Sequence, residues 1–295
     1  MKRIIISGAG GFLGSQIVEK ISLSDSLEVL AITSKPKKYR DCRNVPTILT
    51  DYFLRGSFQF NEDNVFINCL FPMYANKEDL EAGAEISNQV IKVAKDYNIK
   101  SFINISSQRV YGPEREHPAK ETDSVSPQTA YAKAKVDNEI LCDSVFDAIP
   151  HANIRLSSLL GVGYSKQLVN RMVLLALENK RIEIKGGMQR YSFLDVRDAA
   201  DALLIMGLSD PKLWQPVYNL GNNSSYSLSE IALVIKNSLS SKGINITIVT
   251  NSGDDTSSSE LDASLFMHDF DWTPVYSLEQ SINDIIDYQL VETHE

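Results

Sequence analysis

The sequence is poor in cysteine and in basic residues, and it contains no long hydrophobic run. Its 3 cysteines, Cys42, Cys69 and Cys142, are odd in number and scattered, which predicts free thiols and not a disulfide framework. Lys and Arg number 29 against 38 Asp and Glu, a formal charge of −9, whereas nucleic-acid-binding proteins usually present a basic face. The longest apolar run near the middle, Met172–Leu177, is far too short to span a bilayer. We therefore expect a soluble, cytosolic protein with no nucleic-acid partner and no membrane span.

The residues that are present predict a folded α/β protein. The chain has 295 residues, of which 43% are hydrophobic, enough for one large unit or two joined ones. Short apolar runs alternate with amphipathic stretches through the first half, which predicts a Rossmann-like, doubly wound parallel sheet. The expected strands are 3–7, 27–33, 47–49, 64–70, 101–106 and 153–157, and the expected helices are 14–22, 79–97 and 127–145.

The pattern changes after about residue 157. Helical stretches at 167–179, 196–208 and 228–240 are separated by short strand candidates, and residues 244–249 alternate as in a half-exposed strand. Two predicted helices begin with capping boxes, Ser227 with Glu230 and Ser277 with Gln280. We expect residues 251–260 to form a surface loop or a substrate lid. We expect an NAD(P)-binding domain at 1–157 with a return segment at 191–220, and a smaller α+β substrate domain at 158–190 and 221–295.

A glycine-rich turn follows the first strand directly and precedes the first helix. Glycines at positions 8, 11 and 14 allow a sharp turn and a close backbone approach to a pyrophosphate. The following helix would offer its N–H groups and its partial positive charge to the same phosphates. The turn therefore predicts dinucleotide binding by Gly8, Gly11, Phe12, Leu13 and Gly14.

A tyrosine and a lysine lie four residues apart in the third predicted helix. Tyr131 and Lys135 would share one helix face, and a nearby ammonium favours the phenolate of a tyrosine whose ordinary pKa is about 10. With 12 tyrosines in the chain the spacing alone carries little weight. The sequence Ile105-Ser106-Ser107 at the carboxyl end of the fifth predicted strand adds a hydroxyl at the edge where parallel sheets bind ligands.

The glycine turn, the Ser-Ser strand end and the Tyr-Lys helix, in this order, resemble the extended short-chain dehydrogenase/reductase family. Its members are NAD(P)-dependent epimerases, dehydratases and reductases of nucleotide-activated sugars. The likeness continues through Ile154–Ser158 with Gly161, Phe193–Ala200, Tyr218–Gly221 and Phe270–Pro274.

The resemblance implies a role for each matching residue. Tyr131 would exchange a proton with a sugar hydroxyl or ketone, Lys135 would lower the pKa of Tyr131 and bind the nicotinamide ribose, and Ser107, rather than Ser106, would share the reacting oxygen. Asp51 and Tyr52, after the third predicted strand, would meet the adenine. Ser158 and Arg190 are candidate substrate contacts, although Arg190 lies one residue before the place where family members carry an arginine. The resemblance also implies a homodimer through two long helices, and no metal is expected.

Departures from the family pattern narrow the expected reaction. Sugar 4,6-dehydratases carry an Asp-Glu pair where this chain has Gln108 and Arg109, and the cysteine that GDP-fucose synthases use near this strand end is missing. Neither Gln108 nor Arg109 can act as a carboxylic acid, so hydride chemistry alone remains. We expect a keto-sugar reductase. The alternatives are a nucleotide-sugar 4-epimerase, a reductase of a non-sugar ketone or aldehyde on the same fold and, from another class, a non-catalytic NADP(H)-sensing protein.

The second predicted strand ends without the acidic residue that NAD-specific members use to bind the ribose 2′-hydroxyl. Ser34 and Lys35 stand there instead and would bind a 2′-phosphate. Five basic residues fall within nine positions, at Lys35, Lys37, Lys38, Arg40 and Arg43. The sequence therefore favours NADP(H) as the cofactor, with NAD(H) as the alternative.

Overall fold

The chain forms two compact units in a computed structural model that describes residues 2–42, 44–56, 64–72 and 76–292. The first unit comprises Met1–Val110, Ser124–Leu156 and Ala200–Tyr218, and the second comprises Tyr111–Asp123, Ser157–Ala199 and Asn219–Glu295. Residues 111–123, 157, 191–199 and 219–220 therefore group differently from the predicted domain limits. Backbone bonds explain the first difference, since Ala119 N donates to the carbonyl of Glu260 at 3.1 Å. The functions expected of the two parts stay predictions.

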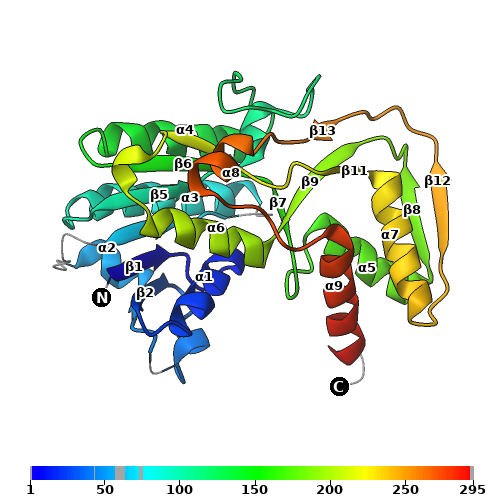
Figure 1. The fold of residues 1–295 in the computed structure, drawn as a ribbon, viewed down its shortest axis with the longest axis horizontal. Helices are drawn as coiled ribbons and strands as arrows, with labels where there is room; N and C mark the ends of the chain where they lie inside the picture. Colours follow the sequence, from blue (N-terminus) through cyan, green and yellow to red (C-terminus); the bar gives the residue numbers. More distant parts are fainter. Residues whose placement is uncertain (1, 43, 57–63, 73–75, 293–295) are drawn as a thin grey trace. The chain divides into compact units, whose positions relative to one another are not determined.

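The first unit is built on a seven-stranded sheet in the order β10-β6-β5-β4-β1-β2-β3. Figure 1 labels β1, β2, β5 and β6 of this sheet. The pairings from β6 through β5, β4, β1 and β2 to β3 are parallel. The strands are β1 (Lys2–Ser7), β2 (Leu27–Thr33), β3 (Thr47–Leu49), β4 (Val65–Asn68), β5 (Ser101–Ile105), β6 (His151–Leu156) and β10 (Val217–Leu220). This arrangement confirms the predicted doubly wound parallel sheet, because β1 lies between strands that follow it on either side.

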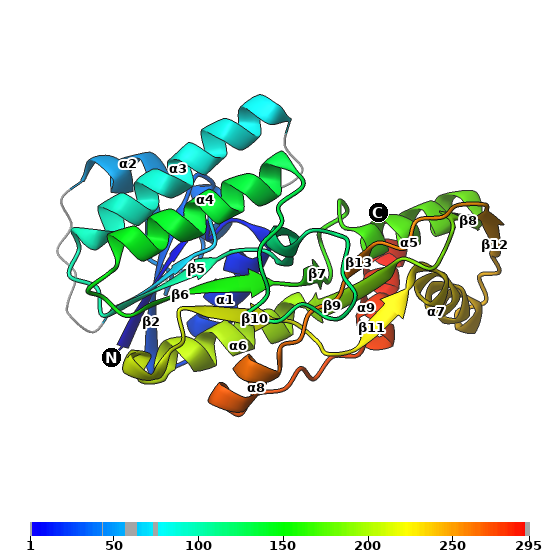
Figure 2. The same cartoon turned by 90° about the horizontal axis from the view of Figure 1, so that it is seen from above.

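Helices cover both faces of this sheet, as a parallel sheet with apolar faces requires. Figure 2 shows α2, α3 and α4 on one face and α1 and α6 on the other. The helices are α1 (Phe12–Ser22), α2 (Thr50–Arg55), α3 (Lys77–Lys95), α4 (Ala130–Val145) and α6 (Val196–Leu208), with short 3-10 turns η1 (Pro36–Tyr39), η2 (Gln108–Tyr111) and η3 (Pro211–Leu213). Helix α4 begins at Ala130 and not at the predicted residue 127, because the Thr129 hydroxyl caps it by accepting from Ala132 N at 3.1 Å.

A buried polar row crosses four adjacent strands, from the last residues of β1 and β4 through β5 to the middle of β6. Ser7, Asn68, Asn104 and Asn153 are paired in register from β1 through β4 and β5 to β6. Their side chains hydrogen-bond in series, at 2.6, 3.2 and 2.8 Å. The row satisfies these buried polar groups and links the four strands to one another.

The second unit contains small sheets and their covering helices. Strands β11 (Ser225–Ser227), β9 (Arg190–Asp195) and β13 (Ser258–Ser259) form one sheet with β7 (Ser158–Leu160), and β12 (Thr247–Asn251) pairs with β8 (Arg181–Lys185). The helices are α5 (Leu168–Asn179), α7 (Leu228–Ser241), α8 (Ser264–Phe270) and α9 (Leu278–Glu292). Both predicted capping boxes form, and the segment predicted as a loop at 251–260 contains β13.

No helix within the described ranges is both long enough and apolar enough to cross a membrane.

Candidate active site

The turn between β1 and α1 has glycine where a side chain would collide with backbone. Gly8 has φ +68°, and a Cβ there would lie 2.7 Å from Leu70 N and 2.8 Å from the carbonyl carbon of Cys69. A Cβ on Gly14 would overlap the carbonyl oxygen of Gly8. The Gly11 amide closes the turn by donating to that same oxygen at 2.9 Å. The chain therefore passes close to itself here, which only glycine allows at positions 8 and 14.

The first turn of α1 is suited to hold an anion. Gly11 is its N-cap residue, no side chain caps it, and its first turn carries no acidic residue. No acidic side chain of the first turn therefore competes for the amides and the positive end of the helix dipole. The predicted residues Gly8, Gly11 and Gly14, with Phe12 and Leu13 at the start of the helix, fit the diphosphate of a dinucleotide.

Basic side chains lie beside this turn. A Cβ on Gly10 would be 3.3 Å from Cβ of Lys35, and the Tyr39 hydroxyl donates to the carbonyl of Ala9 at 2.5 Å, which ties η1 to the turn. Burial raises the pKa of Tyr39 to about 12. Partial burial, together with the charge of Lys35, lowers the pKa of Lys38. Arg43, the last of the five predicted basic residues, lies outside the described residues.

Lys35 and Ser34 are exposed at the end of β2. The Lys35 amide donates to the Thr33 hydroxyl at 3.0 Å, which fixes the backbone where the strand ends. Asp51 and Tyr52 lie in the first turn of α2, the helix that directly follows β3, and both are exposed. These predicted cofactor contacts therefore follow the ends of neighbouring parallel strands in the first unit.

Lys135 is buried, one helical turn after Tyr131 on α4. Its Nζ donates to the carbonyl of Ile105 at 2.5 Å, and its side chain is 3% exposed. Nζ also lies 3.8 Å from the ring centroid of Phe71. Burial lowers the pKa of Lys135 to about 7, against the opposing influence of Glu139 and Cys69.

Two further side chains contact the ring of Tyr131. Phe71 meets it edge to face, with centroids 5.6 Å apart and planes at 89°. The Arg109 guanidinium carbon lies 5.8 Å from the Tyr131 centroid. Ser107 follows Ile105 by two residues, and its Oγ accepts from the Arg109 amide at 3.3 Å. The structure thus brings Tyr131 and Lys135 together around Phe71.

A buried ion pair stands behind these residues. Arg155 of β6 donates to Glu139 of α4, with Nη2 and Oε2 2.9 Å apart, and the Ser106 hydroxyl donates to the same carboxylate. The Ser106 hydroxyl is therefore bonded in the interior, whereas the Ser107 hydroxyl is bonded, among the described contacts, to one backbone amide. Sequence reasoning missed Phe71, Glu139 and Arg155. In the sequence, only the position of Phe71 just after a predicted strand could have indicated that it lies near the site. The pairing of Glu139 with Arg155 could not be predicted, because it depends on tertiary contact.

Ser158 and Arg190 belong to the second unit. Ser158 begins β7 and is half-buried. The Arg190 guanidinium bonds the Glu260 carboxylate, with Nε and Oε1 3.0 Å apart, and the Ser225 carbonyl at 3.2 Å. Arg190 is thus held by partners in its own unit, and the substrate roles of both residues stay predictions.

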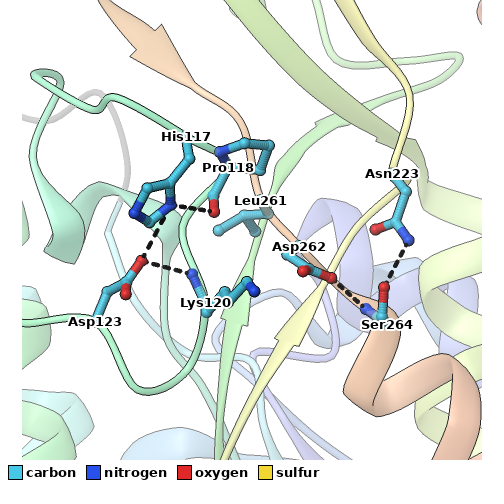
Figure 3. A pocket seen from close by; sticks show the side chains of 8 residues that line it. All are labelled: His117, Pro118, Lys120, Asp123, Asn223, Leu261, Asp262 and Ser264. Carbon is cyan, nitrogen blue, oxygen red and sulfur yellow. Dashed lines mark hydrogen bonds and ion pairs between the residues drawn. The ribbon is translucent and has the colours of Figure 1, made fainter.

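The second unit also contains a cavity of about 670 Å³ (Figure 3). It is lined by His117, Pro118, Lys120, Asp123, Asn223, Leu261, Asp262 and Ser264. Several of its polar groups are already paired: the Lys120 amide donates to Asp123 Oδ2 at 2.9 Å, and Asn223 Nδ2 donates to Ser264 Oγ at 3.1 Å. None of the eight residues was among the predicted site residues.

The protein has the Rossmann fold of dinucleotide-binding proteins. Its parallel sheet is wound in both directions from β1, and a glycine turn joins β1 to α1, which no side chain caps. The chain belongs to the NAD dependent epimerase/dehydratase family, whose model matches residues 4–221. The resemblance inferred from the sequence is therefore confirmed.

Individual relatives are distant but similar over most of their length. The dTDP-D-glucose 4,6-dehydratase of Mus musculus is 21% identical over 78% of this chain and 71% of its own. The UDP-glucuronic acid 4-epimerase of Bacillus cereus, solved with NAD, is 19% identical and covers 99% of this chain and 100% of its own, with a TM-score of 0.82. The dTDP-glucose 4,6-dehydratase of Bacillus anthracis, also solved with NAD, is 20% identical and covers 100% and 98%, with a TM-score of 0.80.

Proposed function

We propose that the protein is an NADPH-dependent reductase of a nucleotide-activated 4-keto sugar. The observation that carries this proposal is the Tyr131–Lys135 pair beside the end of β5, in the same unit as the glycine turn. Relatives that are named for nucleotide-sugar substrates support the substrate class. Gln108 and Arg109 support reduction over dehydration, because neither side chain can serve as a carboxylic acid.

In the proposed reaction, the glycine turn and Lys135 would hold a nicotinamide dinucleotide, which would supply a hydride for the keto carbon. The Tyr131 hydroxyl donates its proton to the ketone oxygen, which becomes the product hydroxyl, and Ser107 donates a hydrogen bond to the same oxygen. Lys135 binds the nicotinamide ribose and returns a proton to Tyr131. A pKa of about 7 suits Lys135 to pass a proton at neutral pH.

The preference for NADPH rests on the basic surface beside the glycine turn. Lys35 packs near Gly10, and its charge contributes to the lowered pKa of Lys38, so the two ammonium groups lie near one another. Such a pair favours a 2′-phosphate, and no acidic residue ends β2 to repel it. A reductase must reload its cofactor after each turnover, which also fits NADPH; an epimerase returns its hydride and can keep NAD.

Two further assignments extend the proposal. The first is that Ser158 and Arg190 of the second unit contact the substrate.

The second is that two copies of the chain associate through α3 and α4. Exposed apolar side chains on these helices, Ile86 at 37% and Ile140 at 61%, support such a dimer. Light scattering of the protein and of an Ile140→Asp variant tests it: a monomeric wild type would contradict the dimer.

Product analysis tests the reaction. We expect purified protein to convert a 4-keto nucleotide sugar with one NADPH consumed per product, and Tyr131→Phe to abolish the conversion. Conversion of a hexose nucleotide to its epimer without net NADPH consumption would instead establish the 4-epimerase. If the protein binds NADPH, and Tyr131→Phe leaves every measured activity unchanged, the non-catalytic sensing role replaces both.

A further inference from the structure

Phe71 is the side chain that contacts both members of the Tyr131–Lys135 pair. It follows β4 by three residues, at the same sheet edge as the glycine turn and the end of β5. The Lys135 ammonium lies 3.8 Å from its ring centroid, and the Tyr131 ring meets it at 89° with centroids 5.6 Å apart. A cation within about 6 Å of a ring centroid is attracted by the ring face, and an edge-to-face arrangement is a favourable one for two aromatic rings.

We infer that Phe71 is a positioning residue of this site: its ring holds the Lys135 ammonium in place and fixes the Tyr131 ring beside it. The link to turnover rests on the proposed function, whereas the effect on Lys135 does not. Nothing in the sequence pattern required an aromatic residue at this position.

The environment of Lys135 explains why a ring matters there. The ammonium has one hydrogen-bond acceptor among the described contacts, the Ile105 carbonyl, and it is almost fully buried. Its ionisable neighbours are Glu139 on its own helix and Cys69 at the end of β4, while Arg109 lies beside Tyr131. The negative face of the Phe71 ring therefore supplies attraction for a charge that burial disfavours.

An aliphatic side chain of similar size would keep water out but would lack this attraction. In Phe71→Leu the charged form of Lys135 should become less favourable, so its pKa should fall further. In Phe71→Trp the ring face is kept and the pKa should stay or rise, since tryptophan attracts cations best. A role in packing alone predicts no such difference between the two variants.

The experiment measures urea unfolding from pH 5 to pH 9 on nucleotide-free protein. Wild type, Phe71→Leu and Phe71→Trp are each compared with the same protein carrying Lys135→Met, so that other titrating groups cancel. We expect the inflection of this difference to move down by about 0.5–1 pH unit in Phe71→Leu and to be restored in Phe71→Trp. Phe66→Leu is the matched control: Phe66 is a buried ring of β4 that stacks on Phe102 at 5.2 Å, and its loss should leave the inflection in place.

The same variants are then assayed for turnover against pH. The alkaline limb of kcat should move with the unfolding inflection, which would support the positioning role. If the inflections of Phe71→Leu and wild type coincide, the inference is overturned, whatever the activity. Should Phe71→Leu fail to fold, Phe71→Met replaces it with the same expected shift. A shifted inflection in a protein without any turnover would uphold the role of Phe71 while contradicting the proposed function.

Discussion

The buried amino group of Lys135 should make the free energy of unfolding depend on pH, and the substitution Lys135→Met should remove this dependence. Burial lowers the pKa of Lys135 to about 7, while in the unfolded chain it has the ordinary value of 10.5. Between these values the unfolded state binds the proton and the folded state does not. Raising the pH therefore favours folding, and the gain is lost as the pH falls through 7. Lys135→Met keeps the length and the apolar stem of the side chain but cannot titrate.

The size of the effect follows from the two pKa values. Stability relative to the variant should rise with a slope approaching about 1.4 kcal/mol per pH unit above pH 7, because one proton separates the two states. Integrated from pH 7 to pH 9, the wild type should gain about 2 kcal/mol over Lys135→Met. Below pH 6 the difference should be constant, since both states are then protonated. The lost bond to the Ile105 carbonyl adds a constant offset that does not alter this shape.

Urea unfolding of both proteins at half-unit steps from pH 5.5 to pH 9 measures the difference. Nucleotide is removed first, since a bound cofactor would stabilise the folded state and mask the effect. Lys133→Met, an exposed lysine on the same helix, is the control and should leave the wild-type pH dependence unchanged. A difference between wild type and Lys135→Met that stays flat within about 0.5 kcal/mol across this range would refute the reasoning, because it would mean that Lys135 titrates alike in both states.

Three further changes probe other parts of the first unit. Lys35→Ala should weaken binding of NADPH by about tenfold and of NADH by less than twofold, measured by cofactor fluorescence, because it removes one charge-assisted bond to a 2′-phosphate. Gly8→Ala should destabilise the protein in urea by more than about 2 kcal/mol and abolish cofactor binding, because the strain of φ +68° and contacts of 2.7–2.8 Å with backbone act together. Glu139→Gln should cost about 3–5 kcal/mol in the same assay, since it removes the carboxylate charge from the buried ion pair with Arg155.

Each of these three substitutions has its own control or contradicting result. Equal losses of NADPH and NADH affinity in Lys35→Ala would contradict a 2′-phosphate contact. Gly163→Ala is the matched control for Gly8, because Gly163 has φ +85° but nothing within 4 Å of the added Cβ. An equal cost at both glycines would show that strain alone acts. For Glu139, a cost below about 1 kcal/mol would mean that the Arg155 charge finds water or another partner.

Local signals determined the fold class and the outline of the site. Alternating apolar runs and helices require a parallel sheet with covered faces, and the glycines at 8, 11 and 14 mark a backbone that approaches itself. The spacing of Tyr131 and Lys135 places them on one helix face whatever surrounds them. These are properties of neighbouring residues, so they could be predicted without knowledge of distant contacts.

Tertiary structure alone decided what surrounds that pair. Only strand register aligns Asn68, Asn104 and Asn153 into a row, because each comes from a different strand. Burial of Lys135 depends on β5 supplying a carbonyl and on Phe71 arriving from the end of β4, sixty-four residues earlier in the chain. The pKa of an ammonium is governed by desolvation and nearby charge, which sequence spacing does not specify. The sequence by itself determined which groups could do chemistry, and the packing of distant segments determined the environment in which they would do it.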